Sequence, residues 1–475
     1  MVNPGKVTAS LCSFRANVAL LLPVLLWSPA ARAQQPVALT GGTLIDGRGG
    51  TPIADAVVVI RDGRIACAGS RRTCTVPSGA RMVDVRGRWL MPGMVDAHVH
   101  YSQTGWADGR PDALDMRERF PYIETIAKLK DARPFYRANL CAGVTATFDV
   151  GGFPWTWTLR ASTERDSLAP HVSAAGPLLS TRDHWLNVPG ERQFLYIGTD
   201  SAVQDGARYL IANRTDAVKV WFLAGASSPD TADWKRRIRI AGDMTRRAGI
   251  PLIVHATGLW QAKEALRAGA KLLVHGVSDR AIDEEFLELA RRNGTVYTPT
   301  LVVSNGYQQL RARAFDRAAY GESLACVDPA TRAKAFLTDS LPGAPSAEQV
   351  ARAKQTTRER FALEADNVRR VHAAGIAMAM GTDAGNPLTL HGPSVYLEME
   401  ALHAAGLTPM QVIVAATRNG ALAMGRLADF GTIERGKIAD LLVLRADPVA
   451  DIRNARTVEL IVRGGTVHRR SDLTF

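Results

Sequence analysis

Four histidines and one aspartate stand where short apolar segments of the chain end. His98 and His100 are two residues apart in an extended stretch, His255 and His275 each close an apolar run, and Asp383 follows another. Residues two apart on a strand point to the same face, and parallel strands end at the same edge of a sheet. Imidazole nitrogens and carboxylates are common ligands of divalent cations. The spacing therefore predicts a metal centre at one rim of a sheet.

Lys219 is unusual because it interrupts the apolar strand pattern of residues 217–222. Desolvation lowers the pKa of a buried amine, and a neutral amine can add carbon dioxide to become a carbamate. The two oxygens of a carbamate can bridge two cations. The alternative is a lysine that extends from the strand end and keeps its ammonium group in water. Both interpretations remain open at this point.

The segments that carry these residues alternate between short strands and helix-like stretches. The predicted strands cover residues 144–148, 217–222, 251–255, 272–275, 295–297 and 377–380. Gly269 is placed to end one helix, and Thr408 with Pro409 is placed to begin another. This alternation predicts an α/β fold, a (β/α)8 TIM-like barrel over residues 93–430, whose chemistry lies at the C-terminal ends of its strands. We expect the charged insertion 307–355 to cover the barrel mouth.

Both ends of the chain have the pattern of short strands. Residues 57–60 are β-branched and precede a hairpin turn at 61–64, and residues 439–444 and 458–462 are further apolar runs. These segments predict a small β-sandwich domain assembled from residues 34–92 and 431–475.

Residues 1–33 have the pattern of a secretory signal peptide. Lys6 precedes an apolar run at 18–27, and an Ala-x-Ala site ends at Ala33. The apolar run is shorter than the roughly 20 residues that a membrane-spanning helix needs. We therefore expect a cleaved signal, no stable membrane anchor and a secreted or periplasmic protein. An uncleaved anchor is the alternative.

Composition excludes several other classes. The 475 residues are 46% hydrophobic and 22% charged, which is typical of a globular protein. The net charge is +12, but the basic residues are scattered, and the densest run, 235–239, has the pattern of a solvated helix face. This argues against a nucleic-acid partner. Five cysteines without a Cys-x-x-Cys pair exclude a thiolate zinc finger. Cys67 and Cys74 are spaced to close a short hairpin loop as a disulfide, with free thiols as the alternative.

In order and strand position, six residues resemble the binuclear metal site of the amidohydrolase superfamily: His98, His100, Lys219, His255, His275 and Asp383. The motifs WLMPGMVD at 89–96 and GTIERGKIAD at 431–440 are similar to that family's connections between its β domain and its barrel. Residues 254–279 and 381–387 most resemble the imidazolonepropionase-like branch, which includes metal-dependent dipeptidases and ochratoxin-hydrolysing amidases.

The resemblance implies two divalent metal ions. His98, His100 and Asp383 would hold the more buried ion, and His255 with His275 the more exposed one. Carboxylated Lys219 and a hydroxide would bridge both ions. Asp383 would act as general base and then as general acid, passing the proton of the water to the leaving amine. Histidine-rich ligation favours zinc, and it also suits manganese, cobalt and iron.

One departure from the family pattern narrows the expected reaction. Deaminases and true imidazolonepropionases of the superfamily carry a glutamate shortly after the strand-five histidine, whereas His255 is followed by Ala256, Thr257 and Gly258. This favours hydrolysis of an acyclic amide, and we expect a dipeptide or an N-acyl amino acid as the small-molecule substrate. The alternatives are a lactonase or esterase that uses the same site, and a catalytically silent barrel that only binds ligands. A homo-oligomer is compatible with the sequence.

Three further residues are candidates for substrate contacts. His184 follows strand three, Tyr297 ends strand seven, and His391 lies in the loop after Asp383. Each could polarise the carbonyl or bind a carboxylate, or could simply be structural. We expect His184 to take a catalytic part.

Two tryptophans and two further histidines have structural alternatives of the same kind. Trp155 and Trp157 follow strand two and would either form an aromatic wall over the pocket or pack against the barrel. His372 and His403 lie on helical patterns that face away from the rim, so we expect structural roles for both.

Overall fold

The computed structural model describes residues 35–475, which form one compact unit. The predicted signal peptide, residues 1–33, lies outside the described residues. Within residues 35–475, no helix has both the length and the apolar character needed to cross a membrane.

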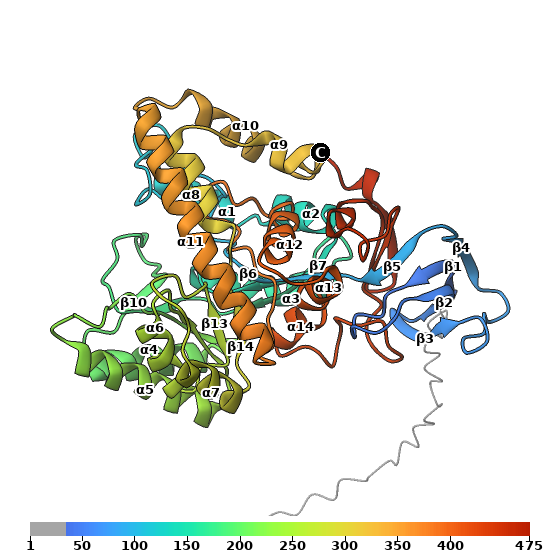
Figure 1. Cartoon of the computed structure of the whole chain (residues 1–475), viewed down its shortest axis with the longest axis horizontal. Coiled ribbons are helices and arrows are strands. Elements are labelled where there is room, and N and C mark those ends of the chain that lie inside the picture. The colour runs from blue at the N-terminus through green and yellow to red at the C-terminus, as the bar shows by residue number, and fades with distance from the viewer. Residues whose placement is uncertain (1–34) are drawn as a thin grey trace, which may run out of the picture. The chain divides into compact units, whose positions relative to one another are not determined.

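The small domain is one continuous sheet built from both ends of the described chain. Its strands are β1 (Val37–Leu44), β2 (Ile53–Arg61), β3 (Arg64–Ser70), β4 (Arg81–Asp84), β5 (Trp89–Pro92), β15 (Leu441–Leu444), β16 (Val458–Arg463) and β17 (Thr466–Arg469). The strand order is β17-β16-β15-β5-β1-β2-β3, with β4 beside β1. The early strands (blue) and the last segments (dark red) lie side by side in Figure 1. Leu39 and Val58 share one core with Leu441 and Val462, so neither end can complete this domain alone.

The predicted hairpin turn at 61–64 connects β2 to β3, as expected. Asp62 and Gly63 both have positive φ, 50° and 74°, which suits the right-handed twist of a two-residue hairpin. A Cβ atom on Gly63 would lie 2.9 Å from the carbonyl oxygen of Gly464. The turn is therefore also a place where the two ends of the chain approach too closely for a side chain.

The middle of the chain forms the predicted α/β barrel. Its strands are β6 (Met94–Val99), β7 (Val144–Asp149), β8 (His171–Ala174), β9 (Leu178–Ser180), β11 (Val218–Trp221), β12 (Leu252–His255), β13 (Leu272–Val274) and β14 (Val296–Thr298). β8 and β9 together form the third barrel strand, since β8 pairs with β7 and β9 pairs with β11. β10 (Phe194–Tyr196) extends the sheet from β9. Residues 377–384 close the ring through single parallel bridges, from Met378 to Tyr297 and from Ala384 to Val99. Alternate residues such as Ile253, Leu272 and Val296 fill the interior.

Helices surround the barrel on its outer side. They are α1 (Tyr122–Leu129), α2 (Arg133–Cys141), α3 (Leu159–Glu164), α4 (Asp200–Ala212), α5 (Thr231–Ala248), α6 (Leu259–Arg267), α7 (Glu284–Asn293), α12 (Ser394–Ala404), α13 (Pro409–Ala416) and α14 (Arg418–Ala423). As predicted, α6 ends just before Gly269, which has φ +89°, and the Thr408 side chain caps α13.

The predicted insertion is helical and leads into the longest helix of the described chain. It contains α8 (Val303–Ala312), α9 (Arg317–Tyr320), η3 (Gly321–Cys326), α10 (Pro329–Leu337) and η4 (Thr338–Ser340), and α11 (Ala347–Ala373) follows. In Figure 1, α11 runs from the insertion along one side of the barrel.

Four cysteines form two disulfides. Cys67 is bonded to Cys74, which was one of the two alternatives open from the sequence. Cys141 at the end of α2 is bonded to Cys326 in η3, 185 residues away. This second bond was not predicted, and it fastens the insertion to the barrel.

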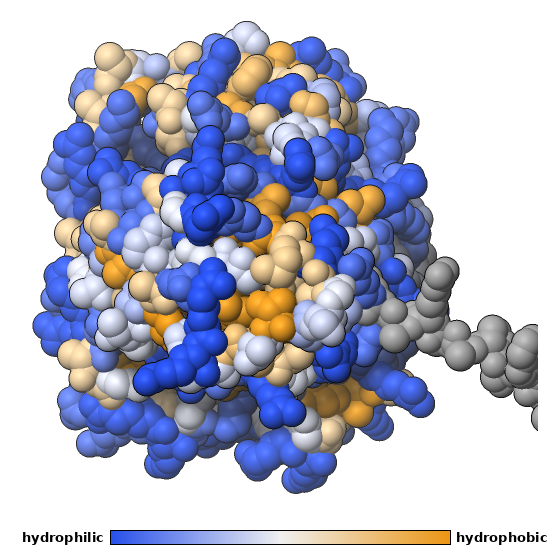
Figure 2. All heavy atoms as spheres, turned by 90° about the vertical axis from the view of Figure 1, so that its right-hand side faces the viewer, coloured by the Kyte–Doolittle hydropathy of each residue, from blue (hydrophilic) through white to orange (hydrophobic). Residues whose placement is uncertain are grey.

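Figure 2 shows the face of the molecule that lies on the right in Figure 1, where the small domain is located. Hydrophobic residues gather near the middle of this face, and hydrophilic residues surround them. Met82 of β4 is an exposed apolar side chain of this domain, with 54% of its surface accessible. Proteins commonly expose single apolar side chains in this way.

Candidate active site

A cavity of about 600 Å³ opens at the C-terminal ends of the barrel strands. Five of the six predicted metal ligands line it: His100, Lys219, His255, His275 and Asp383. The sixth, His98, is fully buried and lies against Asp383. The structure therefore brings all six residues, which come from distant parts of the sequence, to one place.

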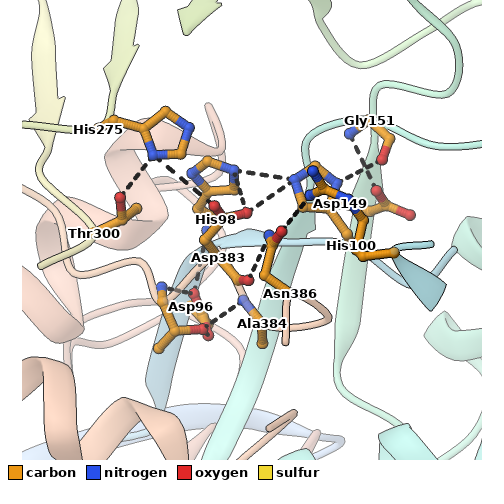
Figure 3. A network of polar contacts seen from close by, with 12 residues as sticks. Asp96, His98, His100, Asp149, Gly151, His275, Thr300, Asp383, Ala384 and Asn386 are labelled. Atoms are coloured by element: carbon orange, nitrogen blue, oxygen red, sulfur yellow. Dashed lines mark hydrogen bonds and ion pairs between the residues drawn. The ribbon is translucent and has the colours of Figure 1, made fainter. Parts of the chain in front are cut away.

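Three of these side chains converge closely (Figure 3). The Nε2 atoms of His98 and His100 lie 3.2 Å apart, and they lie 3.2 Å and 3.0 Å from Oδ1 of Asp383. All three residues are buried, and their ligand atoms lie within 4.8 Å of one another. This is the spacing of donor atoms around one cation.

The neighbours of this cluster favour neutral rings with free lone pairs. The Nδ1 atom of His100 lies 2.6 Å from the carbonyl oxygen of Gly151, which can only accept a hydrogen bond. Burial lowers the pKa of His98 to about 4, so this ring is neutral at pH 7. Within residues 35–475, Oδ1 of Asp383 has no hydrogen-bond donor. With the proton of His98 on Nδ1, its Nε2 lone pair would point to the same place as those of His100 and Asp383, so these residues fit a metal ion.

His255 and His275 form a second group beside the first. Their ring centroids lie 4.3 Å apart, and the centroid of His275 lies 4.9 Å from that of His98. The Nδ1 atom of His275 lies 2.8 Å from Oγ1 of Thr300 and 3.9 Å from Oδ2 of Asp383. Burial lowers the pKa of His255 to about 3. The second group is therefore also neutral and faces the same carboxylate.

Lys219 points into the barrel because strand residues alternate in direction. Its neighbours Val218 and Val220 belong to the outer core between the strands and the helices, so Lys219 faces inward. The side chain is buried, with 2% of its surface accessible, and burial lowers its pKa to about 7. This placement disagrees with a lysine whose ammonium group reaches water.

Backbone strain accompanies the site. His275, Thr300 and Asp383 all have positive φ, 77°, 49° and 61°. Such conformations cost roughly 1–3 kcal/mol each in residues other than glycine and concentrate at functional sites. Asp96 holds the Asp383 loop in place, since it accepts hydrogen bonds from the backbone and the hydroxyl of Thr382. Asp96 and Thr300 were not predicted from the sequence, although Asp96 shares the strand face of His98.

The structure places the three predicted substrate-contact residues away from the cavity surface. His184 lies behind Phe194 and Trp221, with its Nε2 atom 3.7 Å from Oδ2 of Asp112. The hydroxyl of Tyr297 accepts a hydrogen bond from the backbone of Val277.

His391 stacks between two aromatic rings, those of Tyr101 and Phe135, at centroid distances of 5.3 Å and 4.3 Å. It is buried and does not line the cavity. Of the three candidates, only His184 contacts a cavity-lining acid, Asp112.

The other aromatic residues pack as structural residues do. Trp157 lies against the core and contacts Tyr209, and Trp155 packs against a neighbouring apolar cluster. Neither lines the cavity, so the packing alternative holds. His372 and His403 lie exposed on α11 and α12, as expected.

The insertion contributes to the mouth of the cavity, as predicted. Tyr307 and Arg311 from α8 and Arg360 from α11 line it, and Arg110 from the loop after β6 lies beside Tyr307. These residues were not predicted from the sequence. The only signal for Arg110 was its place after the first barrel strand, since loops at that end carry site residues.

A barrel with buried histidines and an aspartate at this rim defines a metal-dependent hydrolase. The profile of the Amidohydrolase family matches residues 89–467, and the chain belongs to that family. It is thus a hydrolase that acts on carbon–nitrogen bonds of small molecules.

Individual relatives share about a quarter of the sequence. Imidazolonepropionase of Caulobacter vibrioides is 27% identical over 423 residues, which cover 86% of this chain and 92% of that protein. Ochratoxinase of Aspergillus niger is 25% identical over 464 residues, covering 90% of this chain and 85% of that protein.

Solved structures agree on the fold. The crystal structure of A. niger ochratoxinase has a TM-score of 0.68 at 23% identity, covering 92% of this chain and 96% of that one. A Xaa-Pro dipeptidase with bound methionine in its active site has a TM-score of 0.67 at 21% identity, covering 92% and 100%. The family and the fold expected from the sequence are therefore confirmed.

Proposed function

We propose that the protein is a binuclear metal-dependent amidohydrolase that cleaves the amide bond of a dipeptide or an N-acyl amino acid. The observation that carries this proposal is that six side chains converge, five of them on the cavity wall and His98 against Asp383: His98, His100, Lys219, His255, His275 and Asp383. A barrel that had lost its activity would not need to keep a complete set of ligands.

The donor set suggests how two ions divide these residues. His98, His100 and Asp383 would hold the inner ion, as their mutual distances of 3.0–3.2 Å support. His255 and His275 would hold the outer ion. Lys219, as a carbamate, would bridge the two, since it is buried and faces inward. The nitrogen-rich set favours zinc.

When bound, two such ions activate a water molecule and polarise the amide carbonyl. Asp383 then has the proton-transfer role. Its Oδ2 atom faces His275 at 3.9 Å while Oδ1 faces His98 and His100. The carboxylate therefore takes the proton of the attacking water and delivers it to the leaving nitrogen, which completes the amine product.

The cavity suits a small acyclic amide. Its volume lies within the range of small-molecule sites. Leu178, Leu186, Phe194 and Trp221 form an apolar wall that would accept the acyl group. Thr257, and not an acid, lines the cavity after His255, so no carboxyl group stands there to protonate a ring nitrogen. The names of the relatives, ochratoxinase and Xaa-Pro dipeptidase, agree with amide hydrolysis.

We also propose that the protein works in an oxidising compartment after export. Residues 1–33 carry the signal-peptide pattern, and two disulfides are typical of secreted or periplasmic proteins.

The test combines metal analysis with a substrate panel. Purified protein should contain about two divalent metal ions per chain and should lose activity after chelation. The panel should contain dipeptides, N-acyl amino acids and lactones. Turnover of amides that returns after zinc, manganese or cobalt is added back supports the proposal. Turnover of lactones alone would reassign the enzyme, and binding without any turnover would indicate a silent barrel.

A further inference from the structure

Glu398 is a buried acid that the metal centre and the proposed reaction leave without a role. It lies on α12 and has no solvent-exposed surface. Its side-chain hydrogen bonds within residues 35–475 are both to backbone amides, and none is to a basic side chain. Burying a carboxyl group without a cation is costly, so these backbone contacts indicate what the residue does.

Each oxygen of Glu398 accepts one hydrogen bond from the start of another helix. The amide of Leu301 donates to Oε1 and the amide of Val302 to Oε2, both at 3.0 Å. The two donors directly precede α8, which has no side-chain cap of its own at Val302. The first amides of a helix need acceptors from elsewhere. Glu398 supplies them from almost a hundred residues further along the chain.

The same backbone segment begins with Thr300, which contacts a predicted metal ligand. The Oγ1 atom of Thr300 lies 2.8 Å from Nδ1 of His275 (Figure 3). A histidine that binds a metal ion through one ring nitrogen donates the proton of the other to an acceptor, which fixes the orientation of the ring. Thr300 is such an acceptor for His275.

Thr300 needs support in this place. Its φ of 49° costs roughly 1–3 kcal/mol in a residue other than glycine. The chain before it is fixed, because the amide of Gly276 donates to the carbonyl oxygen of Pro299 at 2.8 Å. Glu398 fixes the chain after it. The strained residue is therefore held from both sides.

α12 provides a rigid base for Glu398. Tyr396, Met399 and Leu402 of this helix all belong to the main hydrophobic core. Close packing leaves such a helix little room to shift. The carboxyl group is therefore a fixed point to which the segment 300–302 is attached.

We propose that Glu398 is a positioning residue for the outer metal ion, because it fixes Thr300 and, through Thr300, the ring of His275. This inference rests on the proposed function, since it takes His275 as a ligand of the outer ion. Glu398 itself does not line the cavity. The ligands of the inner ion come from β6 and the Asp383 loop and not from the segment 300–302, so we expect the effect to be confined to the outer ion.

A zinc titration of metal-free protein tests this without any substrate. Equilibrium dialysis at buffered zinc concentrations, followed by elemental analysis, gives the affinities of both ions. Glu398→Gln keeps the size of the side chain, but its NH2 group cannot accept the second backbone hydrogen bond. We expect one ion to bind as in the wild type and the other to bind about 10- to 100-fold more weakly.

A second substitution tests the route through Thr300. Thr300→Val removes the hydroxyl group but keeps the shape of the side chain, and it should weaken the same ion to a similar degree. If Glu398 acts through Thr300, adding Glu398→Gln to Thr300→Val should cause little further loss. Two losses that multiply in the double variant would overturn the proposed route.

Asp328→Ala is the matched control. Asp328 also accepts two backbone hydrogen bonds at the start of a helix, from Ala330 at 3.1 Å and Thr331 at 3.0 Å. Its helix, α10, carries none of the predicted metal ligands. This variant should lose stability in urea unfolding and bind both ions normally. The same result for Glu398→Gln would mean that Glu398 is only a helix cap, and it would overturn the proposal.

The outcomes separate this inference from the proposed function. Fewer than two zinc ions bound to the wild-type protein would refute the binuclear centre and the inference with it. If no amide is turned over but Glu398→Gln weakens one ion alone, the inference stands and the proposed reaction fails. If Glu398→Gln does not fold, Glu398→Asp, whose carboxyl group reaches one carbon less far, takes its place with the same expected loss.

Discussion

The Nδ1 atom of His100 lies 2.6 Å from the carbonyl oxygen of Gly151. Because a carbonyl cannot donate, the proton of the ring must be on Nδ1, and Nε2 turns its lone pair toward Asp383 (Figure 3). Backbone contacts of this kind set the tautomer of metal-binding histidines and strengthen them as ligands. The barrel thus prepares His100 for a cation through the backbone of Gly151, which follows β7 and also lines the cavity.

His275→Ala should lower the metal content by about one ion per chain and reduce turnover at least about 100-fold, because it removes a direct ligand. Elemental analysis of the purified variant, together with amide hydrolysis, measures both effects. His372→Ala is the control, since His372 is exposed on α11. Similar losses in the two variants would mean that the strand-end assignment is wrong.

Lys219→Arg should be nearly inactive. Arginine keeps the charge and approximate length but stays protonated, so it cannot add carbon dioxide. Lys219→Ala should also be inactive, and acetate or propionate should restore part of its activity by occupying the bridging position. The measurements are turnover and metal stoichiometry with and without the added acid. Two bound ions with near-normal turnover in Lys219→Arg would refute the carbamate.

Replacing both cysteines of the long-range disulfide, Cys141→Ser with Cys326→Ser, should destabilise the protein more than replacing Cys67 and Cys74. The bonds close loops of very different length, with separations of 185 and 7 residues. Chain-entropy estimates are roughly 5 and 2.5 kcal/mol, and measured effects are often smaller. Urea unfolding under non-reducing conditions compares the two double variants. A larger loss from the short loop would contradict this order.

His171 predicts a pH dependence of stability at the opposite end of the barrel. Its ring lies 2.8 Å from Glu164 and 2.9 Å from Asp440 of the return to the β domain. Burial opposes the charge, but these two carboxylates raise the pKa of His171. Although burial acts against it, contacts with His171 and Arg426 lower the pKa of Glu164 to about 2. The positive charge of Arg463 also lies near His171 and lowers the pKa of this histidine.

The sign follows from these directions. A raised pKa gives His171 a stabilising contribution that is complete below its unfolded value of 6.5 and is lost as the pH rises through the folded value. The lowered pKa of Glu164 gives a contribution that is complete above its unfolded value of 4.5 and is lost as the pH falls toward 2. The contacts therefore stabilise most between about pH 5 and 6.5.

His171→Gln should accordingly lose more stability at pH 5.5 than at pH 8.5, as measured by urea unfolding at both values. His403→Gln, a change in an exposed helical histidine, should show no such difference. An equal loss for His171→Gln at both pH values would mean that packing, and not charge, explains the contribution of this residue.

The residues at the ends of the barrel strands could be predicted from the sequence. Side chains alternate with a period of two along a strand, and parallel strands end at the same rim, so both constraints limit where such residues can lie. The same period explains the misplaced candidate Tyr297. Val296 fills the barrel interior, so Tyr297 must point outward to the helices, although it stands near the end of its strand. Counting from the strand end alone did not take this alternation into account.

Contacts between distant loops could not be predicted from the sequence. Arg110 meets Asn386 across 276 residues, and Cys141 meets Cys326 across 185. No local pattern encodes such pairs, because they depend on how long the insertion is and where it turns back. His391 lies only eight residues after Asp383 in the sequence. The chain turns at Gly385, which has φ +107°, and the segment that follows buries His391 among aromatic rings.

The shared sheet of the small domain has a consequence for the order of events during synthesis. β5 pairs with β1 at only two positions but with β15 at four, from Leu441–Pro92 to Leu444–Trp89. A ribosome delivers β15 only after the entire barrel. Until then β5 has an unpaired edge, a state that favours aggregation. A chain interrupted before Leu441 would therefore contain the barrel sequence, but β5, the strand that leads into the barrel, would lack the partner with which it pairs at four positions.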